Sequence, residues 1–119
     1  MKTLKTLILL LSVILCTACS SDDDNLQANR VPNTFSVSLD DSSSNTGIIA
    51  NWTAAIDPDG DTVTYAVYLN NVLQVQDITA LTYTIVYEVF VNGENTIKLT
   101  ALDGNGGETV QVIPYNFSS

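Results

Sequence analysis

The sequence contains no histidine and only two cysteines, Cys16 and Cys19. Histidine is the side chain that most often transfers protons in catalysis, and cysteine is a common nucleophile. Basic residues are also scarce, with four Lys and Arg against thirteen Asp and Glu. A chain this acidic lacks the basic patches that bind nucleic acids or anionic membrane surfaces. We therefore expect no histidine-dependent catalysis and no nucleic-acid partner.

Other catalytic arrangements are also missing from the sequence. Serine and threonine are plentiful, but none has an evident basic partner. The Gly-rich residues 104–107 join two expected strands and lack the helix that a phosphate-binding or dinucleotide-binding motif requires. Paired carboxylates hydrolyse glycosides when they face each other across a cleft, whereas the acids here lie mostly in expected turns. The sequence predicts a protein that is not an enzyme.

The first 18 residues have the organisation of a secretory signal peptide. Two lysines precede an apolar run over residues 7–16, and the small residue Ala18 precedes a cut. A membrane-spanning helix needs about 20 apolar residues, which is more than this run provides. A buried N-terminal helix is the alternative, although the run has no amphipathic face.

Residues 16–19, Cys-Thr-Ala-Cys, resemble the bacterial lipobox, in which a small residue and Ala or Gly precede a lipidated cysteine. The match holds at Thr17, Ala18 and Cys19 and departs at Cys16, where Leu is usual. The resemblance implies cleavage after Ala18 and lipidation of Cys19, for which palmitate is a convenient label. Two or more acyl chains give stable anchoring. The mature chain would then hold no disulfide and no cysteine-based zinc site. Secretion without lipidation is the alternative.

An acidic stretch follows Cys19. Three adjacent aspartates, residues 22–24, repel one another and stay hydrated, so residues 19–30 are expected to form an acidic flexible tether. The stretch resembles the acidic signal of surface lipoproteins in Bacteroidota, which implies an outer-membrane protein facing the cell exterior. A tether without a sorting role is the alternative. The mature chain would carry Arg30 and Lys98 against thirteen acids, a net charge of −11 before its termini.

From residue 31 to residue 119 the sequence predicts one all-β domain. Short runs of alternating apolar and polar residues are separated by turns about every 8 to 12 residues, which is typical of a sandwich or barrel. Seven strands are expected, at residues 34–39, 48–53, 62–69, 72–75, 81–85, 96–102 and 108–117. Asn70 and Asn71 suit a two-residue hairpin turn, because Asn accepts the left-handed conformation. Pro114 cannot donate to a ladder, so the last strand is expected at a sheet edge or with a bulge.

Four parts of this domain resemble a fibronectin type III domain in their order and spacing. They are Trp52, residues 57–69 (DPDGDTVTYAVYL), residues 81–85 (LTYTI) and residues 97–107 (IKLTALDGNGG). The resemblance implies a seven-stranded immunoglobulin-like sandwich. It also implies four core residues, which are Trp52, Tyr65, Leu81 and Leu99. The corner tyrosine of that family is missing, and its place falls near Asn95. A PKD-like or cadherin-like sandwich is therefore the alternative subtype.

Asp57, Asp59 and Asp61 form the strongest candidate for a metal site. Alternate carboxylates can converge on a hard cation, and Ca²⁺ takes about 6 to 8 oxygen ligands. The loop is no EF-hand, because Gly60 is at the fourth place instead of the sixth and Tyr68 is where Glu is needed.

A second loop could complete this calcium site. If the fibronectin resemblance holds, residues 103–107 lie at the same end of the sandwich as residues 57–61, and Asp103 and Asn105 could add ligands. The alternative is a plain turn, because Asp-Pro-Asp-Gly is a sequence that reverses the chain. The sequence leaves both interpretations open.

One short motif suggests a modification. Asp61-Thr62-Val63 resembles the O-glycosylation motif of Bacteroidota, which implies a glycan on Thr62. A three-residue match also arises by chance.

The function that the sequence favours is a membrane-anchored, non-catalytic binding or spacer module with a protein or polysaccharide ligand. One alternative is a structural accessory subunit of a cell-envelope assembly, docked by strand addition near Tyr115 and Phe117. Another is a calcium-stabilised, adhesion-like domain. An aromatic patch on the folded domain would favour binding, and a uniformly acidic surface would favour a spacer.

Overall fold

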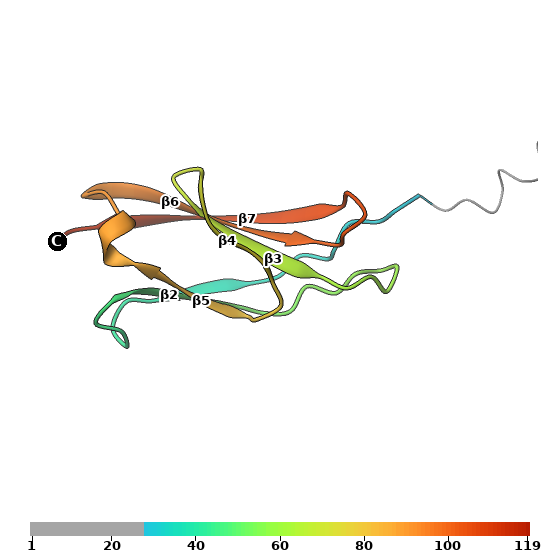
Figure 1. Ribbon diagram of the computed structural model, residues 1–119, viewed down its shortest axis with the longest axis horizontal. Helices are drawn as coiled ribbons and strands as arrows, with labels where there is room; N and C mark the ends of the chain where they lie inside the picture. The colour runs from blue at the N-terminus through green and yellow to red at the C-terminus, as the bar shows by residue number, and fades with distance from the viewer. Residues whose placement is uncertain (1–27) are drawn as a thin grey trace, which may run out of the picture.

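A computed structural model describes residues 28–119, which form two antiparallel β-sheets without an α-helix (Figure 1). The elements are β1 (Val37–Asp40), β2 (Gly47–Trp52), β3 (Thr64–Leu69), β4 (Val72–Ile78), β5 (Thr82–Val86), the short 3₁₀ helix η2 (Tyr87–Val89), β6 (Gly93–Leu102) and β7 (Glu108–Phe117). The predicted all-β class with seven strands is confirmed. Within these residues no helix has the length and apolarity needed to cross a membrane.

The two sheets face each other as the layers of a sandwich (Figure 1). The smaller sheet has the order β1-β2-β5 and the larger has the order β4-β3-β6-β7. In constant-type immunoglobulin domains the fourth strand lies beside the fifth, whereas β4 here pairs with β3 in the other sheet. Strand β7 lies at a sheet edge, as Pro114 predicts, because a proline has no N–H for a second partner strand.

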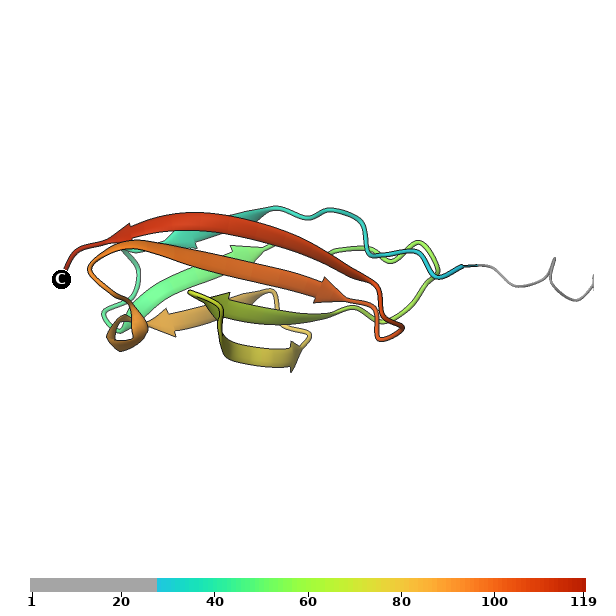
Figure 2. The ribbon, with the colours of Figure 1, turned by 90° about the horizontal axis from the view of Figure 1, so that it is seen from above.

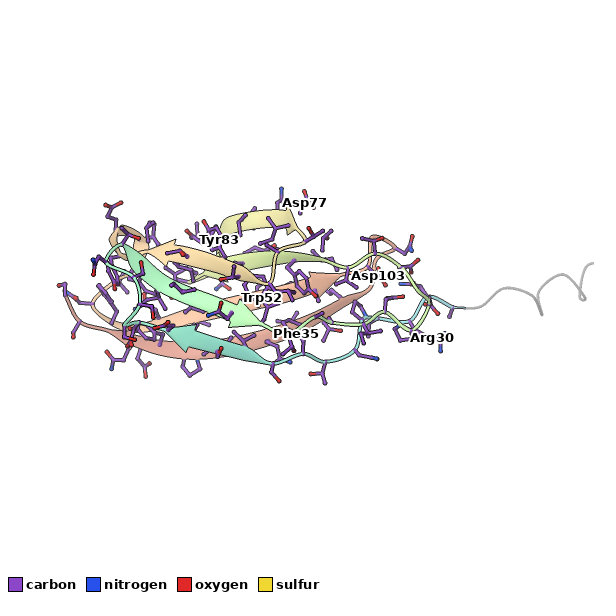
Figure 3. All side chains as sticks on the ribbon, turned by 90° about the horizontal axis from the view of Figure 1, so that it is seen from below. Arg30, Phe35, Trp52, Asp77, Tyr83 and Asp103 are labelled. Atoms are coloured by element: carbon purple, nitrogen blue, oxygen red, sulfur yellow. The ribbon has the colours of Figure 1, made fainter. Side chains whose placement is uncertain are left out.

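Inward side chains of both sheets fill the core. Tyr65 lies at its centre, with its ring 5.5 Å from that of Trp52 and 5.9 Å from that of Phe35. Figure 3 shows Phe35 and Trp52 along the middle of the domain. The prediction that Trp52, Tyr65 and Leu99 are core residues is confirmed. It is wrong for Leu81, which is 39% exposed because it precedes β5 in a bend outside the two sheets.

Asn95 takes the place of the missing corner tyrosine. It is only 2% exposed, and its side chain uses all of its hydrogen-bonding capacity. The Nδ2 group donates to the carbonyls of Val91 and Gly93, while Oδ1 accepts the Val91 N–H and the Asn70 side-chain N–H. A tyrosine corner also bonds to backbone a few residues upstream. Asn95 therefore closes the β5–β6 corner with a different side chain.

The β3–β4 hairpin turns as predicted. Asn70 and Asn71 have φ values of 50° and 67°, and they separate the paired residues Leu69 and Val72. Asn70 also exchanges hydrogen bonds with the backbone of Thr96 in β6. The turn therefore holds the hairpin against the sheet.

Strand β1 begins at Val37, three residues later than predicted. The preceding segment instead runs beside β7 (Figure 2), where Thr109 donates to the carbonyl of Pro32 and Gln111 donates to Thr34. These side-chain contacts replace ladder pairing, so the segment is extended without being a strand.

Candidate functional site

The two ends of the sandwich differ in chemistry. The chain enters at one end and the C-terminus lies at the other (Figures 1 and 2). We call the entry end, formed by residues 29–30, 57–61 and 103–107, the acidic end. We call the opposite end, formed by Tyr87, Phe90, Tyr115 and Phe117, the aromatic end.

A tight turn shapes the first loop of the acidic end. The carbonyl of Asp57 accepts the N–H of Gly60 at 3.1 Å, with Pro58 at the second turn position. Asp57 Oδ1 also accepts the N–H groups of Asp59 at 2.9 Å and Asp61 at 3.2 Å. Side-chain bonds of this kind stabilise Asx turns. The plain turn that the sequence offered as one interpretation is therefore present.

The same turn gathers the three carboxylates that the sequence singled out. One oxygen each from Asp57, Asp59 and Asp61 lies within 4.8 Å of the others. Asp57 is only 7% exposed, and its Oδ2 is buried without a hydrogen-bond partner in the structure. The same loop therefore contains both the turn and the carboxylate cluster.

Arg30 is bound to this loop. Its backbone N–H donates to Asp59 Oδ2 at 2.7 Å, and its guanidinium Nε and Nη2 each lie 2.8 Å from Asp59 Oδ1. Nη2 also donates to the carbonyl of Pro58 at 3.0 Å. The backbone N–H of Arg30, followed by its guanidinium, lowers the pKa of Asp59 below its ordinary value. Arg30, which the sequence assigns to the tether, is therefore joined to the sandwich.

Asp103 organises the second loop of the acidic end. Its Oδ1 accepts the N–H groups of Asn105 at 2.8 Å and Gly107 at 2.9 Å, and its Oδ2 accepts Asn29 Nδ2 at 2.7 Å. The Asn105 N–H and then the Asn29 amide lower the pKa of Asp103. A Cβ atom at Gly107 would lie 2.1 Å from Asp103 Oδ2, so this position requires glycine.

The structure brings both predicted loops to one end, where Figure 3 shows Arg30 and Asp103. The close carboxylate group, however, contains Asp57, Asp59 and Asp61 without Asp103. Asp103 is occupied by its own loop and by Asn29, and Asn105 contributes backbone groups to these contacts. The geometry therefore assigns Asp103 and Asn105 to holding the loop and Asn29 together.

Aromatic rings gather at the aromatic end. Phe117 is stacked on Tyr87 and Phe90, with ring centroids 5.8 Å and 5.2 Å away, and Phe90 meets the ring of Tyr115 at 5.7 Å. Tyr115 and Phe117, which the sequence offers for strand addition, are half-buried in this cluster. Sequence reasoning missed Tyr87 and Phe90, because no local spacing connects them with the last strand.

A hollow of about 560 Å³ opens beside these rings, and its lining includes Tyr87, Tyr115, Phe117 and Asp41. The hydroxyl of Tyr115 donates to Asp41 Oδ2 at 3.4 Å, and that of Tyr87 donates to the carbonyl of Ser44 at 3.1 Å. Burial, followed by the nearby Asp41 carboxylate, raises the pKa of Tyr115. The hollow combines fixed ring faces with polar groups that can bond to a ligand.

Two other predicted features belong to different parts of the chain. The signal peptide and Cys19 lie outside the described residues. Thr62 is exposed in the segment before β3, so a glycan on it would meet no packed neighbour.

No known protein family matches the chain, and a comparison with curated proteins finds no relative. The fibronectin type III resemblance and the Bacteroidota-type lipoprotein resemblance therefore stay predictions.

Proposed function

We propose that this protein is an exported lipoprotein, anchored in the outer membrane through Cys19, whose sandwich binds a neutral glycan without catalysis. The observation that carries this proposal is the position of the aromatic hollow. The hollow lies at the end that carries the C-terminus. Arg30, where the segment that leads from Cys19 reaches the domain, lies at the opposite end (Figure 3).

Anchoring would set the direction in which the hollow faces. Ten residue steps separate Cys19 from Asn29, a span of at most about 36 Å when fully extended. The acidic end is held to this segment through Asn29 and Arg30. A lipid on Cys19 would therefore keep the acidic end near the membrane and leave the aromatic end free to meet a ligand.

The chemistry of the hollow fits a sugar. Tyr87, Tyr115 and Phe117 line the hollow, and none of these rings is fully buried, so the apolar C–H faces of a sugar can pack against their exposed parts. The Asp41 carboxylate can accept hydrogen bonds from sugar hydroxyls. Ligand sites usually combine apolar side chains with a few placed polar groups, and the lining of this hollow supplies both kinds of group. A neutral glycan is favoured, because the acidic protein surface repels acidic polymers.

Binding of the purified full-length chain, in detergent, to arrayed neutral and acidic glycans tests this proposal. We expect retention by at least one neutral glycan and by no acidic one. Asp41→Ala and Tyr87→Leu remove two walls of the hollow and should each weaken retention at least about fivefold, the loss of about one polar contact. Asp77→Asn removes an equal charge in β4, at a position outside the lining of the hollow and with a φ of 59° that Asn accepts, and should leave retention unchanged.

Two results would overturn the proposal. The first is the absence of retention on every neutral glycan, which would favour a spacer role for the domain. The second is retention that is equally strong in the Asp41→Ala and Tyr87→Leu variants, which would place binding elsewhere on the molecule.

A further inference from the structure

We propose that Asp57, Asp59 and Asp61 bind one Ca²⁺ ion at the acidic end. This inference is independent of glycan binding, because it concerns the opposite end of the sandwich.

The buried oxygen of Asp57 is the first reason. A carboxylate oxygen taken out of water without a partner is unfavourable, and buried charges are normally paired or bound to metal. Asp57 Oδ1 accepts two backbone N–H groups, which fix the carboxylate in place. Oδ2 has no partner in the structure and belongs to the residue that anchors the cluster. A cation bound by the Asp57 carboxylate would give this oxygen a partner.

The spacing of the oxygens is the second reason. Calcium–oxygen distances are about 2.3 to 2.6 Å, so two ligands on opposite sides of one ion lie at most about 5 Å apart. The three carboxylate oxygens lie within 4.8 Å of one another, so an ion at their centre is at most about 2.8 Å from each, and small side-chain movements bring all three within binding distance. With oxygen donors alone, a hard cation is the expected occupant.

The local charge supports a divalent ion. Three carboxylates meet one cationic side chain, Arg30, whose guanidinium bonds to Asp59 and to the Pro58 carbonyl. No hydrogen bond in the described chain joins Arg30 to Asp57 or Asp61. The cluster thus keeps an excess of two negative charges, which one Ca²⁺ would balance. Water would complete the coordination shell.

Calorimetric titration of the purified full-length chain with CaCl₂, together with melting curves, tests this site. Three protein carboxylates and several waters resemble the weak sites of extracellular modules, so we expect a dissociation constant of about 10⁻⁴ to 10⁻³ M. The melting temperature should rise with Ca²⁺, because the ion binds the folded state. NaCl at matched ionic strength controls for screening of surface charge.

Charge-removing variants locate the ion. Asp57→Asn and Asp61→Asn should each weaken Ca²⁺ binding at least about tenfold, because each removes a charged ligand. The Asp57 side chain also holds the turn, so Asp57→Asn could fail to fold. In that case Asp61→Asn alone tests whether the ion binds at this loop. Asp77→Asn is the matched control and should bind Ca²⁺ as the unchanged chain does. Asp77 has a φ of 59°, which Asn accepts.

Three outcomes would overturn the inference. One is no heat and no rise in melting temperature at about 10 mM Ca²⁺, ten times the weakest expected dissociation constant. Another is an equal rise with NaCl, which would mean charge screening alone. The third is unchanged Ca²⁺ affinity in Asp61→Asn.

Discussion

At the scale of single residues, the most informative position is Asn95. The sequence shows only that a tyrosine is missing there, and it offers no sign that an amide could close the same corner. The structure shows why asparagine suffices. Its two donors and its acceptor oxygen bond directly to Val91, Gly93 and Asn70, so the corner needs no aromatic ring.

Replacing Asn95 with alanine should destabilise the protein by about 3 kcal/mol, because the buried partners of the amide would lose their hydrogen bonds at about 1 to 3 kcal/mol for each unsatisfied group. Urea unfolding followed by tryptophan fluorescence measures this loss, since the single Trp52 lies in the core. Asn116→Ala, at an exposed site in β7, should change stability by less than about 0.5 kcal/mol. Equal effects from the two variants would contradict the role of Asn95.

The candidate site was only partly predictable at this scale. The alternate aspartates of residues 57–61 can be found in the sequence, because carboxylate spacing is local. The attachment of Arg30 to Asp59 and of Asn29 to Asp103 spans 29 and 74 residues, and no sequence pattern reports such pairs. Tyr87 and Phe90 of the aromatic end were missed for the same reason.

At the scale of elements, the strands were predicted well because alternation and turn residues are local signals. The boundaries that differ are set by pairing in three dimensions. β4 continues to Ile78 because its ladder with β3 resumes after a register shift, with Ile78 opposite Tyr65. β6 begins at Gly93 because β7 is long enough to pair with it to Phe117. Neither partner strand can be identified from the segment itself.

The aspartates in the loops of the acidic end should make the free energy of unfolding depend on pH. The pKa values of Asp59 and Asp103 lie below 3.8 in the folded state, so their contribution to stability is complete above about pH 4 and is lost as the pH falls through the lowered values. Melting temperatures measured between about pH 5 and pH 2 should fall steadily. The fall should be smaller in Asp103→Asn than in the unchanged chain. An identical fall in both proteins would show that Asp103 gains nothing from Asn105 and Asn29.

At the scale of the whole molecule, two chemically different groups of side chains lie at opposite ends of the sandwich. The three clustered carboxylates lie at the end where the chain enters, and the stacked rings with the open hollow lie at the end of the C-terminus. Figure 1 shows these two ends of the sandwich. With the proposed lipid anchor near the acidic end, the ligand site at the aromatic end would face away from the membrane. The arrangement follows from the antiparallel topology, which the sequence predicted, although the chemical contrast between the ends was not predicted.

Metabolic labelling with palmitate tests the proposal that Cys19 holds this domain on a membrane. The unchanged chain, Cys16→Ala and Cys19→Ala would be expressed in a bacterium that processes lipoproteins, purified and compared for bound label. We expect label on the unchanged chain and on Cys16→Ala, and none on Cys19→Ala. Equal label on Cys19→Ala, or no label on the unchanged chain, would contradict the proposal.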